Sequence, residues 1–502
     1  MDVDTSGGIL DEDVAMQMMI EQSLQQSHKP TQLKSSYSGD ACRIVQISPE
    51  REKIFSAIKD GDENSLRKLT VHDCCFSEED STGFIPLHEA AIQNNLNILQ
   101  ITFTASPEEA KHRKTHRGKT ALFLAVEKGL LDNTFFLLDH GSSPDPLDKE
   151  EDSPLIVAIR NDQREMVDLL LRFGARVNQE CVNRRTALHE AARLGLTEIL
   201  DLLIKNGAHA DPRSSFGLTP LALAAQAGYL DIMRTLIHRG ADVESQAQDC
   251  ATILFEACIS GNPDVISLLL KSGADANVPK HTGHLPIHRV AHRGHLKALA
   301  LLIPVTSWDA VDDSGISPLH SAAAGGHTHC LEMLLNAGYD PNFMLHPWVR
   351  RSYDDKRQSA LYFAVSNDDV SSARVLLEAG AMPNQDPVKC LQFCEVISVS
   401  FLKHLSGSVV RIMMDYVDHV NFCSKLKAVL MEQKQWAEIC HFQENVRCLQ
   451  HLCRLKIRAC LGRLRLRAPI FMSFLPLPKR LKHYIQYREY DLYGQKCQTQ
   501  SK

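Results

Sequence analysis

Apolar residues recur along this chain in short clusters, and one leucine or isoleucine in each cluster serves as an anchor for comparison. Nine phrases of the form small residue, Pro or Ala, then an aliphatic residue place the anchors at Leu87, Leu122, Leu155, Leu188, Leu221, Leu254, Ile287, Leu319 and Leu361. Successive anchors are 35, 33, 33, 33, 33, 33, 32 and 42 residues apart. A period of this length predicts stacked supersecondary units that bury their apolar faces against one another.

Each unit is predicted to be a pair of helices. Thr or Ser before the anchor can cap free backbone N–H groups, and Pro fits the first helical turn, where its missing N–H costs nothing. Ala-Ala pairs keep the first helix thin, and paired leucines mark the second helix. Seven residues after each anchor the chain must turn back, so we expect left-handed backbone at Gly129, Gly195, Gly228, Gly261, Gly294, Gly326, Asn94, Asp162 and Asp368.

The repeated phrase and its period resemble the ankyrin repeat. The fold expected from this resemblance is all-α, an ankyrin-repeat solenoid of about ten helix-pair repeats. That number includes a degenerate repeat around Ile54, Ile58 and Leu66, which would cap the stack. We predict the array over residues 51–386 and a helical closing segment over 387–444. The pattern stops abruptly at 385–397, which leaves open a shortened form of a longer array.

Composition narrows the class of protein. The 502 residues are 44% hydrophobic and 23% charged, with a net charge of −6, which does not favour a nucleic-acid or anionic-membrane binder. The 15 cysteines include no Cys-x-x-Cys pair, and no apolar run reaches the roughly 18 residues of a membrane span. We therefore expect reduced thiols and a cytoplasmic protein, with the nucleus as a second compartment.

The clearest functional signal lies near the C-terminus. Residues 448–458 read CLQHLCRLKIR, so that Leu449, Cys453 and Ile457 share one helical stripe. An exposed apolar stripe suits a groove on a partner protein, and the small Cys admits close helix approach. Residues 475–485 then read LPLPKRLKHYI, in which two prolines hold the chain extended before helical spacing resumes.

These two segments resemble the elongin C-binding part and the cullin box, of the cullin-5 type, of a SOCS box, which we expect over residues 445–495. The resemblance implies that Leu449, Cys453 and Ile457 bind elongin C. It implies that the cullin-binding residues are Leu475, Pro476, Leu477, Pro478 and Tyr484. Cys448 departs from the usual Ser or Thr, which bears on where the helix begins. Two other interpretations stay open, a C-terminal cap on the solenoid and a basic nucleic-acid patch over residues 447–482.

A short motif near the N-terminus carries a weaker signal. Acidic residues 11–13 precede an apolar face formed by Met16, Met19, Ile20, Ser23 and Leu24. This pattern resembles a ubiquitin-interacting motif, although Met19 stands where Ala is usual, and it implies that these five residues bind ubiquitin. An amphipathic helix in a loose tail is the alternative. We assign residues 1–27 to this helix and residues 28–50, rich in Ser, Pro and Gly, to a flexible linker.

Together the three parts resemble the ankyrin repeat and SOCS box family, in its subgroup with an N-terminal ubiquitin-interacting motif. The resemblance implies a non-catalytic substrate-recognition subunit of an E3 ubiquitin ligase, working with elongin B/C, cullin-5 and a RING subunit. Bound proteins would be ubiquitylated and degraded by the proteasome. No cofactor is implied. The alternative function is an ankyrin scaffold that tethers protein partners without recruiting a ligase.

Substrate-binding candidates follow from position and residue type. Hairpin tips precede each anchor, and those carrying Arg184, Arg185 and Phe216 offer residues typical of protein interfaces. The 42-residue spacing before Leu361 contains an insertion with Trp348, Arg350 and Arg351. We expect this loop to contribute to substrate capture, although a Trp that packs on its own repeat is equally consistent with the sequence.

Residues that imitate enzyme motifs do not complete them. His288 and His292 have the spacing of a zinc protease helix, but Arg289 replaces the required Glu. His288 also holds the same repeat position as His88, His189 and His320, where a structural hydrogen bond is expected. The sequence therefore predicts neither a metal site nor a catalytic site.

Overall fold

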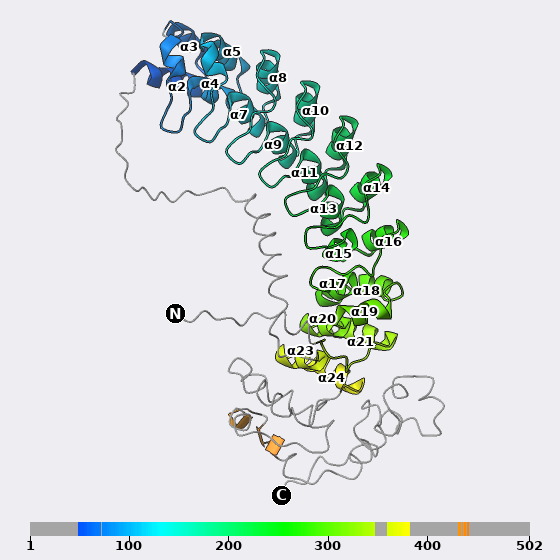
Figure 1. Ribbon diagram of the computed structural model, residues 1–502. Coiled ribbons are helices and arrows are strands. Elements are labelled where there is room, and N and C mark those ends of the chain that lie inside the picture. Colours follow the sequence, from blue (N-terminus) through cyan, green and yellow to red (C-terminus); the bar gives the residue numbers. More distant parts are fainter. Residues whose placement is uncertain are drawn as a thin grey trace, which may run out of the picture. The chain divides into compact units, whose positions relative to one another are not determined.

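The computed structural model describes residues 49–71, 73–346 and 359–381, together with short pieces at 430–432, 434, 436–437 and 439–440. The chain divides into two compact units, Pro30–Ala274 in one and Met1–Lys29 with Asp275–Lys502 in the other. The described part of each unit is built from short helices (Figure 1). The β-bridges in these residues are two isolated antiparallel ones, Gln246–Thr252 and Met344–Ser359.

Helix pairs repeat through the unit that ends at Ala274. The first helices of the pairs form one row and the second helices another, and long connecting loops extend from the first row (Figure 1). The first row consists of α4 (Pro86–Ala91), α7 (Ala121–Glu127), α9 (Pro154–Arg160), α11 (Ala187–Leu194), α13 (Pro220–Ala227) and α15 (Ile253–Ala257). The second row consists of α5 (Leu96–Ala105), α8 (Leu131–Asp139), α10 (Arg164–Arg172), α12 (Thr197–Lys205), α14 (Leu230–His238) and α16 (Pro263–Lys271).

A further helix pair precedes α4. It is formed by α2 (Pro49–Asp60) and α3 (Glu63–Leu69), followed by the 3-10 helix η2 (Asp73–Ser77). The side chains of Ile54, Ile58 and Leu66 are fully buried, as expected of a degenerate repeat that covers the end of a stack. A single turn, α6 (Glu108–Lys111), lies between α5 and α7.

The unit that starts at Asp275 repeats the same arrangement with one exception. Its pairs are α17 (Pro286–Arg293) with α18 (Leu296–Leu302), α20 (Pro318–Ala324) with α21 (Thr328–Ala337), and α23 (Ala360–Ser366) with α24 (Val370–Glu378). Between α18 and α20 the chain forms an additional helix, α19 (Trp308–Ser314), where the repeat pattern predicts a hairpin. Within the described ranges, no helix combines the length and hydropathy needed to cross a membrane.

The core has the composition that the pattern predicts. Every anchor from Leu87 to Leu361 is buried, as are the alanine pairs Ala90-Ala91, Ala191-Ala192, Ala224-Ala225 and Ala322-Ala323. Small alanines let neighbouring first helices pack closely, while leucines of the second helices fill the space between the rows. Each fully buried leucine contributes roughly 1.5–3 kcal/mol relative to an exposed one.

The predicted caps start the first helices. The hydroxyl oxygens of Thr120, Ser153, Thr219, Thr252 and Ser359 each accept a hydrogen bond from a backbone N–H inside the helix that follows. Pro occupies the first turn of α9, α13, α17 and α20, where no intrahelical partner is needed. Local sequence therefore determines where these helices begin.

Left-handed backbone occurs at eight of the nine predicted turn positions. All six glycines have positive φ, and so do Asp162 (φ 54°) and Asp368 (φ 56°). The prediction for Asn94 is wrong, because its φ is not positive. Helix α4 ends at Ala91, and the residue after it, Ile92, has right-handed backbone.

A second left-handed position lies four residues before eight of the nine anchors. It holds Gly83, Gly118, Glu151, Arg184, Gly217, Cys250 and Gly283 at hairpin tips, and Gly315 at the end of α19. Neighbouring tips are joined by backbone hydrogen bonds, for example from the Ser215 N–H to the Asn183 carbonyl (2.9 Å) and from the Gln248 N–H to the Phe216 carbonyl (3.0 Å). The hairpins are therefore held in register by the backbone.

Candidate functional site

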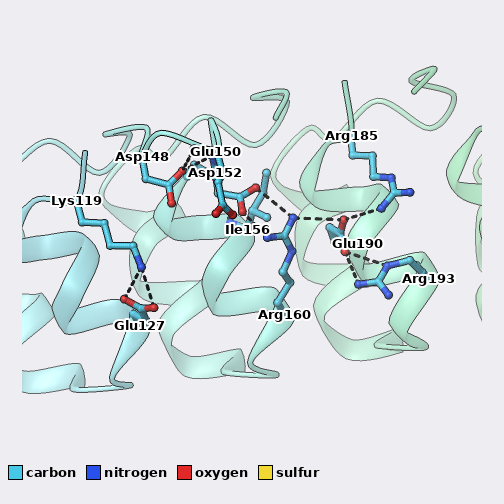
Figure 2. Close-up of polar contacts among 11 residues, drawn as sticks. Lys119, Glu127, Asp148, Glu150, Asp152, Ile156, Arg160, Arg185, Glu190 and Arg193 are labelled. Atoms are coloured by element: carbon cyan, nitrogen blue, oxygen red, sulfur yellow. Dashed lines mark hydrogen bonds and ion pairs between the residues drawn. The ribbon is translucent and has the colours of Figure 1, made fainter. Parts of the chain in front are cut away.

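A row of charged side chains runs across α7, α9 and α11 and the segments that lead into them (Figure 2). The Lys119 ammonium lies 2.9 Å from both carboxylate oxygens of Glu127. In the next repeat Arg160 forms a fork with Asp152, in which Nη2 donates to Oδ1 at 3.1 Å and Nη1 donates to Oδ2. Each pair joins the residue three before an anchor to the residue five after it. The cation comes first in the pair around Leu122, and the carboxylate comes first in the pair around Leu155.

Glu190 on α11 is the centre of the largest charged group. It is 1% exposed, and its Oε2 accepts from Arg193 Nε (3.1 Å) and Nη2 (2.7 Å). Its Oε1 lies 3.6 Å from Arg185 Nη1 and 3.7 Å from Arg160 Nη2, and it accepts no hydrogen bond. We call Asp152, Arg160, Arg185, Glu190 and Arg193 the Glu190 cluster. It holds three positive and two negative groups.

Neighbouring charges favour the ionised forms of Glu190 and Arg160, whereas burial raises the pKa of Asp152 in spite of its pairing with Arg160. Burial by itself raises the pKa of Glu190, but the charges of Arg193, Arg160 and Arg185 outweigh it and hold that pKa below its ordinary value. Burial likewise lowers the pKa of Arg160, but Glu190 and Asp152 outweigh it, and the net shift is upward. Glu190 and Arg160 are therefore charged at neutral pH.

The three predicted substrate-binding residues of the hairpins differ in their exposure to solvent. Arg184 is at a left-handed tip (φ 53°), exposed, with its Nε 3.3 Å from Glu180 Oε2. Phe216, on the next hairpin, is 44% exposed. Arg185 is only 8% exposed and its guanidinium is directed toward Glu190 (Figure 2). Arg184 and Phe216 thus lie on the surface, and Arg185 belongs to the Glu190 cluster.

Histidines at the position after the anchor link consecutive repeats. The Nδ1 atoms of His88, His189 and His288 accept from the N–H three residues earlier, at 3.2, 3.0 and 2.9 Å. This fixes the proton on Nε2, which lies 3.0, 3.0 and 2.8 Å from a carbonyl oxygen of the segment that leads into the next repeat. The hydrogen-bonding role expected for His288 is confirmed. Among the described residues, no group of three or more His, Cys, Asp or Glu could hold a metal ion.

Several surface and cluster residues were not identified from the sequence. Arg160 and Arg193 share a repeat position with Glu127, so charges at a fixed distance after the anchor were an available signal. Trp308 is 54% exposed, with its ring centroid 4.4 Å from that of Tyr339. Its helix α19 has a recognisable start, since Ser307 accepts from the Ala310 N–H at 3.1 Å.

The remaining predicted site residues lie outside the part of the chain that the structure describes. They are the ubiquitin-binding candidates Met16, Met19, Ile20, Ser23 and Leu24, the elongin C-binding candidates Leu449, Cys453 and Ile457, the cullin-binding candidates Leu475, Pro476, Leu477, Pro478 and Tyr484, and Trp348, Arg350 and Arg351 of the insertion. Their roles stay predictions from the sequence.

Comparison with known proteins identifies both parts of the chain. The family "Ankyrin repeats (3 copies)" matches residues 54–147, 87–181, 155–247, 254–345 and 287–387, and the SOCS box family matches residues 445–486. Ankyrin repeat and SOCS box protein 14 is 48% identical in mouse, covering 99% of this chain and 100% of the relative. The human protein is 46% identical, with 99% of each chain covered. The chain belongs to the ankyrin repeat and SOCS box proteins.

This family membership defines the class of protein. An ankyrin array joined to a SOCS box is a substrate-recognition adaptor of a cullin-RING ligase, and the family is not catalytic. A more distant relative, rat ankyrin repeat and SOCS box protein 2, is 32% identical over 37% of this chain and 44% of its own length. The mouse alignment has 586 positions whereas this chain has 502 residues, so at least 84 positions are occupied by the relative alone.

Proposed function

We propose that this protein is the substrate-recognition subunit of an E3 ubiquitin ligase of the cullin-5/elongin B–elongin C type. The observation that carries the proposal is the SOCS box match at residues 445–486, which includes both predicted contact segments and follows an ankyrin array. The array binds a target protein, and a RING subunit on the cullin supplies the ubiquitin-charged enzyme. The target is ubiquitylated and degraded by the proteasome.

The two segments of the SOCS box bind different partner proteins. The helical stripe of Leu449, Cys453 and Ile457 enters a groove on elongin C, because apolar side chains four residues apart form one contact face. The extended segment that begins at Leu475 contacts the cullin, and its prolines reduce the entropy lost on binding. The N-terminal motif at residues 16–24 binds ubiquitin. The assembly works in the cytosol, with the nucleus as a second compartment.

Co-purification tests the proposal directly. The full chain and a chain that lacks residues 445–502 are expressed with elongin B/C and cullin-5, and the recovered complexes are compared. We expect the full chain to recover both and the truncated chain to recover neither. A full chain with Arg164→Gln, on the exposed surface of α10, serves as a matched control and should behave as the unaltered chain. Equal recovery by the truncated chain would leave a tethering scaffold.

A further inference from the structure

Helix α19 presents an aromatic and acidic face to solvent. Val311 and Ser314 lie on the buried side of this helix. The exposed residues, which occupy one continuous side, are Trp308, Asp309, Asp312 and Asp313. We call these four residues the α19 face. Every polar side chain on the α19 face is therefore a carboxylate.

The sequence around α19 adds acidic residues and no basic ones. Between Lys297 and Arg350 the chain contains neither Lys nor Arg, whereas Glu332 and Asp340 are acidic and exposed. Within the described part of the chain, the three carboxylates of the α19 face form no ion pair and no hydrogen bond. Contacts with these residues therefore do not compensate the negative charge of the α19 face.

The three carboxylates do not stabilise the helix that carries them. Asp309 is three residues from Asp312 and four from Asp313, and like charges at these spacings destabilise a helix. Asp312 and Asp313 also lie in the last turn of α19, where the helix dipole favours cations. Side chains that contradict the local rules of stability are expected at functional sites. A positively charged partner accounts for these carboxylates better than folding does.

The aromatic part of the α19 face is fixed in position. The Trp308 ring packs on that of Tyr339, with the centroids 4.4 Å apart, and the residue is still 54% exposed. The segment before it is held by Asn277, whose Oδ1 accepts from the Ser307 N–H (2.7 Å) and whose Nδ2 donates to the Val305 carbonyl (3.3 Å). Val305 is itself 43% exposed. Because these groups are already ordered, less entropy is lost when a partner binds.

We propose that the α19 face docks a basic segment of the recruited protein. An Arg or Lys side chain lies on the exposed surface of the Trp308 ring and pairs with Asp312, one helical turn away on the same side. An apolar neighbour of that side chain contacts Val305. An acidic face repels phosphates, so the occupant is a protein segment and not a nucleic acid or an anionic membrane. The inference rests on the proposed function and specifies its substrate class.

Fluorescence anisotropy on the full-length chain at about pH 7.5 tests the inference, since exposed imidazoles are mostly neutral there. The probes are a labelled peptide of alternating arginine and leucine and the same peptide with neutral citrulline in place of arginine. We expect the arginine peptide to bind and the citrulline peptide to bind about tenfold more weakly or less. Trp308→Leu keeps an apolar side chain but removes the ring, and should weaken binding of the arginine peptide about fivefold.

A double variant separates docking from a structural role. Asp312→Asn with Asp313→Asn should weaken binding of the arginine peptide about tenfold, while its melting temperature stays equal or rises because repulsion within α19 is relieved. Damage to the fold cannot produce that combination. The matched control, Glu244→Gln with Asp264→Asn, removes two exposed carboxylates from the other unit and should change the affinity less than about twofold.

Three results would overturn the inference. They are equal binding of the two peptides, equal effects of the two double variants, and a lower melting temperature of Asp312→Asn with Asp313→Asn. Failure of the arginine peptide to bind the full chain overturns it too, and that result is expected if a second copy or the chain's own basic residues 447–482 cover the face.

Elongin B/C recovery is measured on the same samples. If the unaltered chain recovers no elongin, the proposed function fails whatever the peptides show. Retained elongin without binding of the arginine peptide removes this inference alone.

Discussion

The imidazole of His189 donates a hydrogen bond from Nε2 to the carbonyl oxygen of Leu218, 3.0 Å away in the next repeat. The other ring nitrogen, Nδ1, accepts a hydrogen bond from the Thr186 N–H. The neutral ring therefore links the start of α11 to the following hairpin. This arrangement requires the unprotonated ring, because a second proton on Nδ1 would face a donor.

Stability should therefore depend on pH. Burial lowers the pKa of His88 and His189 to about 4 and that of His288 to about 3, from the ordinary 6.5. At pH values between the lowered pKa of each ring and the ordinary 6.5, the unfolded chain binds more protons than the folded chain. The stabilisation is thus complete above about pH 6.5 and falls as pH drops toward 4, by up to roughly 1.4 kcal/mol per pH unit for each ring. Urea unfolding at about pH 7.5 and pH 5 measures this loss.

A matched pair of variants assigns the pH dependence to the buried rings. His189→Gln should reduce the difference in unfolding free energy between the two pH values. His329→Gln changes an exposed imidazole and should leave that difference as it is. An undiminished difference in His189→Gln would contradict the assignment.

Two glycines with similar backbone should respond differently to alanine. Gly217 (φ 75°) lies at a hairpin tip where an added Cβ would be 2.8 Å from the Gln248 backbone nitrogen. Gly207 (φ 88°) has nothing within 4 Å of that position. Gly207→Ala should cost about 1 kcal/mol from backbone strain alone, and Gly217→Ala should cost more because the hairpins are forced apart. Thermal melting of both variants gives the order, and equal melting temperatures would contradict it.

The elongin contact can be tested within the full chain. Leu449→Ala combined with Cys453→Phe removes one apolar side chain and places a bulky one on the same predicted helical stripe. We expect elongin B/C recovery to be lost, since truncating an interface anchor typically costs about 2 kcal/mol or more. Intact recovery would favour the scaffold function.

The cullin contact should be separable from the elongin contact. Leu475→Ala with Pro476→Ala alters the predicted cullin-binding segment and leaves the predicted elongin C-binding segment, residues 448–458, unchanged. We expect cullin-5 recovery to fall about tenfold or more while elongin B/C recovery persists. Pull-down with quantified cullin and elongin bands checks the difference, and parallel loss of both would show that the two segments act as one contact.

The insertion before Leu361 gives a prediction about substrate. Trp348→Ala with Arg351→Ala removes two residue types that often dominate binding energy. Proximity labelling in cells, compared with the unaltered chain, should show target proteins lost and elongin B/C retained. An unchanged set of labelled targets would exclude the loop from substrate capture.

Local rules explain how much of this fold was predictable. The 33-residue period predicted the repeating helix pairs. Caps such as Ser153 and turn residues such as Asp162 predicted where helices start and stop, because a cap or a turn residue acts on backbone within a few residues. The left-handed backbone at the hairpin tips was not predicted, because Glu151, Arg184 and Cys250 interrupt the glycine pattern at that position. Helix α19 was missed because the surrounding period favoured a hairpin.

The candidate site was less predictable. Arg185 was expected on the surface by its place in a hairpin, yet it turns inward toward Glu190. Arg160, from the preceding repeat, approaches the same oxygen across 30 positions of sequence. Such a group depends on how the repeats stack, which single-residue propensities do not contain.

The histidine bond between repeats also sets where the protein can be divided for laboratory work. A recombinant piece that stopped after α12 would leave the His189 ring without its acceptor at Leu218 and would expose the apolar side of α11. Boundaries placed after a complete hairpin keep that acceptor. Shorter pieces for crystallisation should therefore terminate past the next anchor rather than at the end of a helix pair.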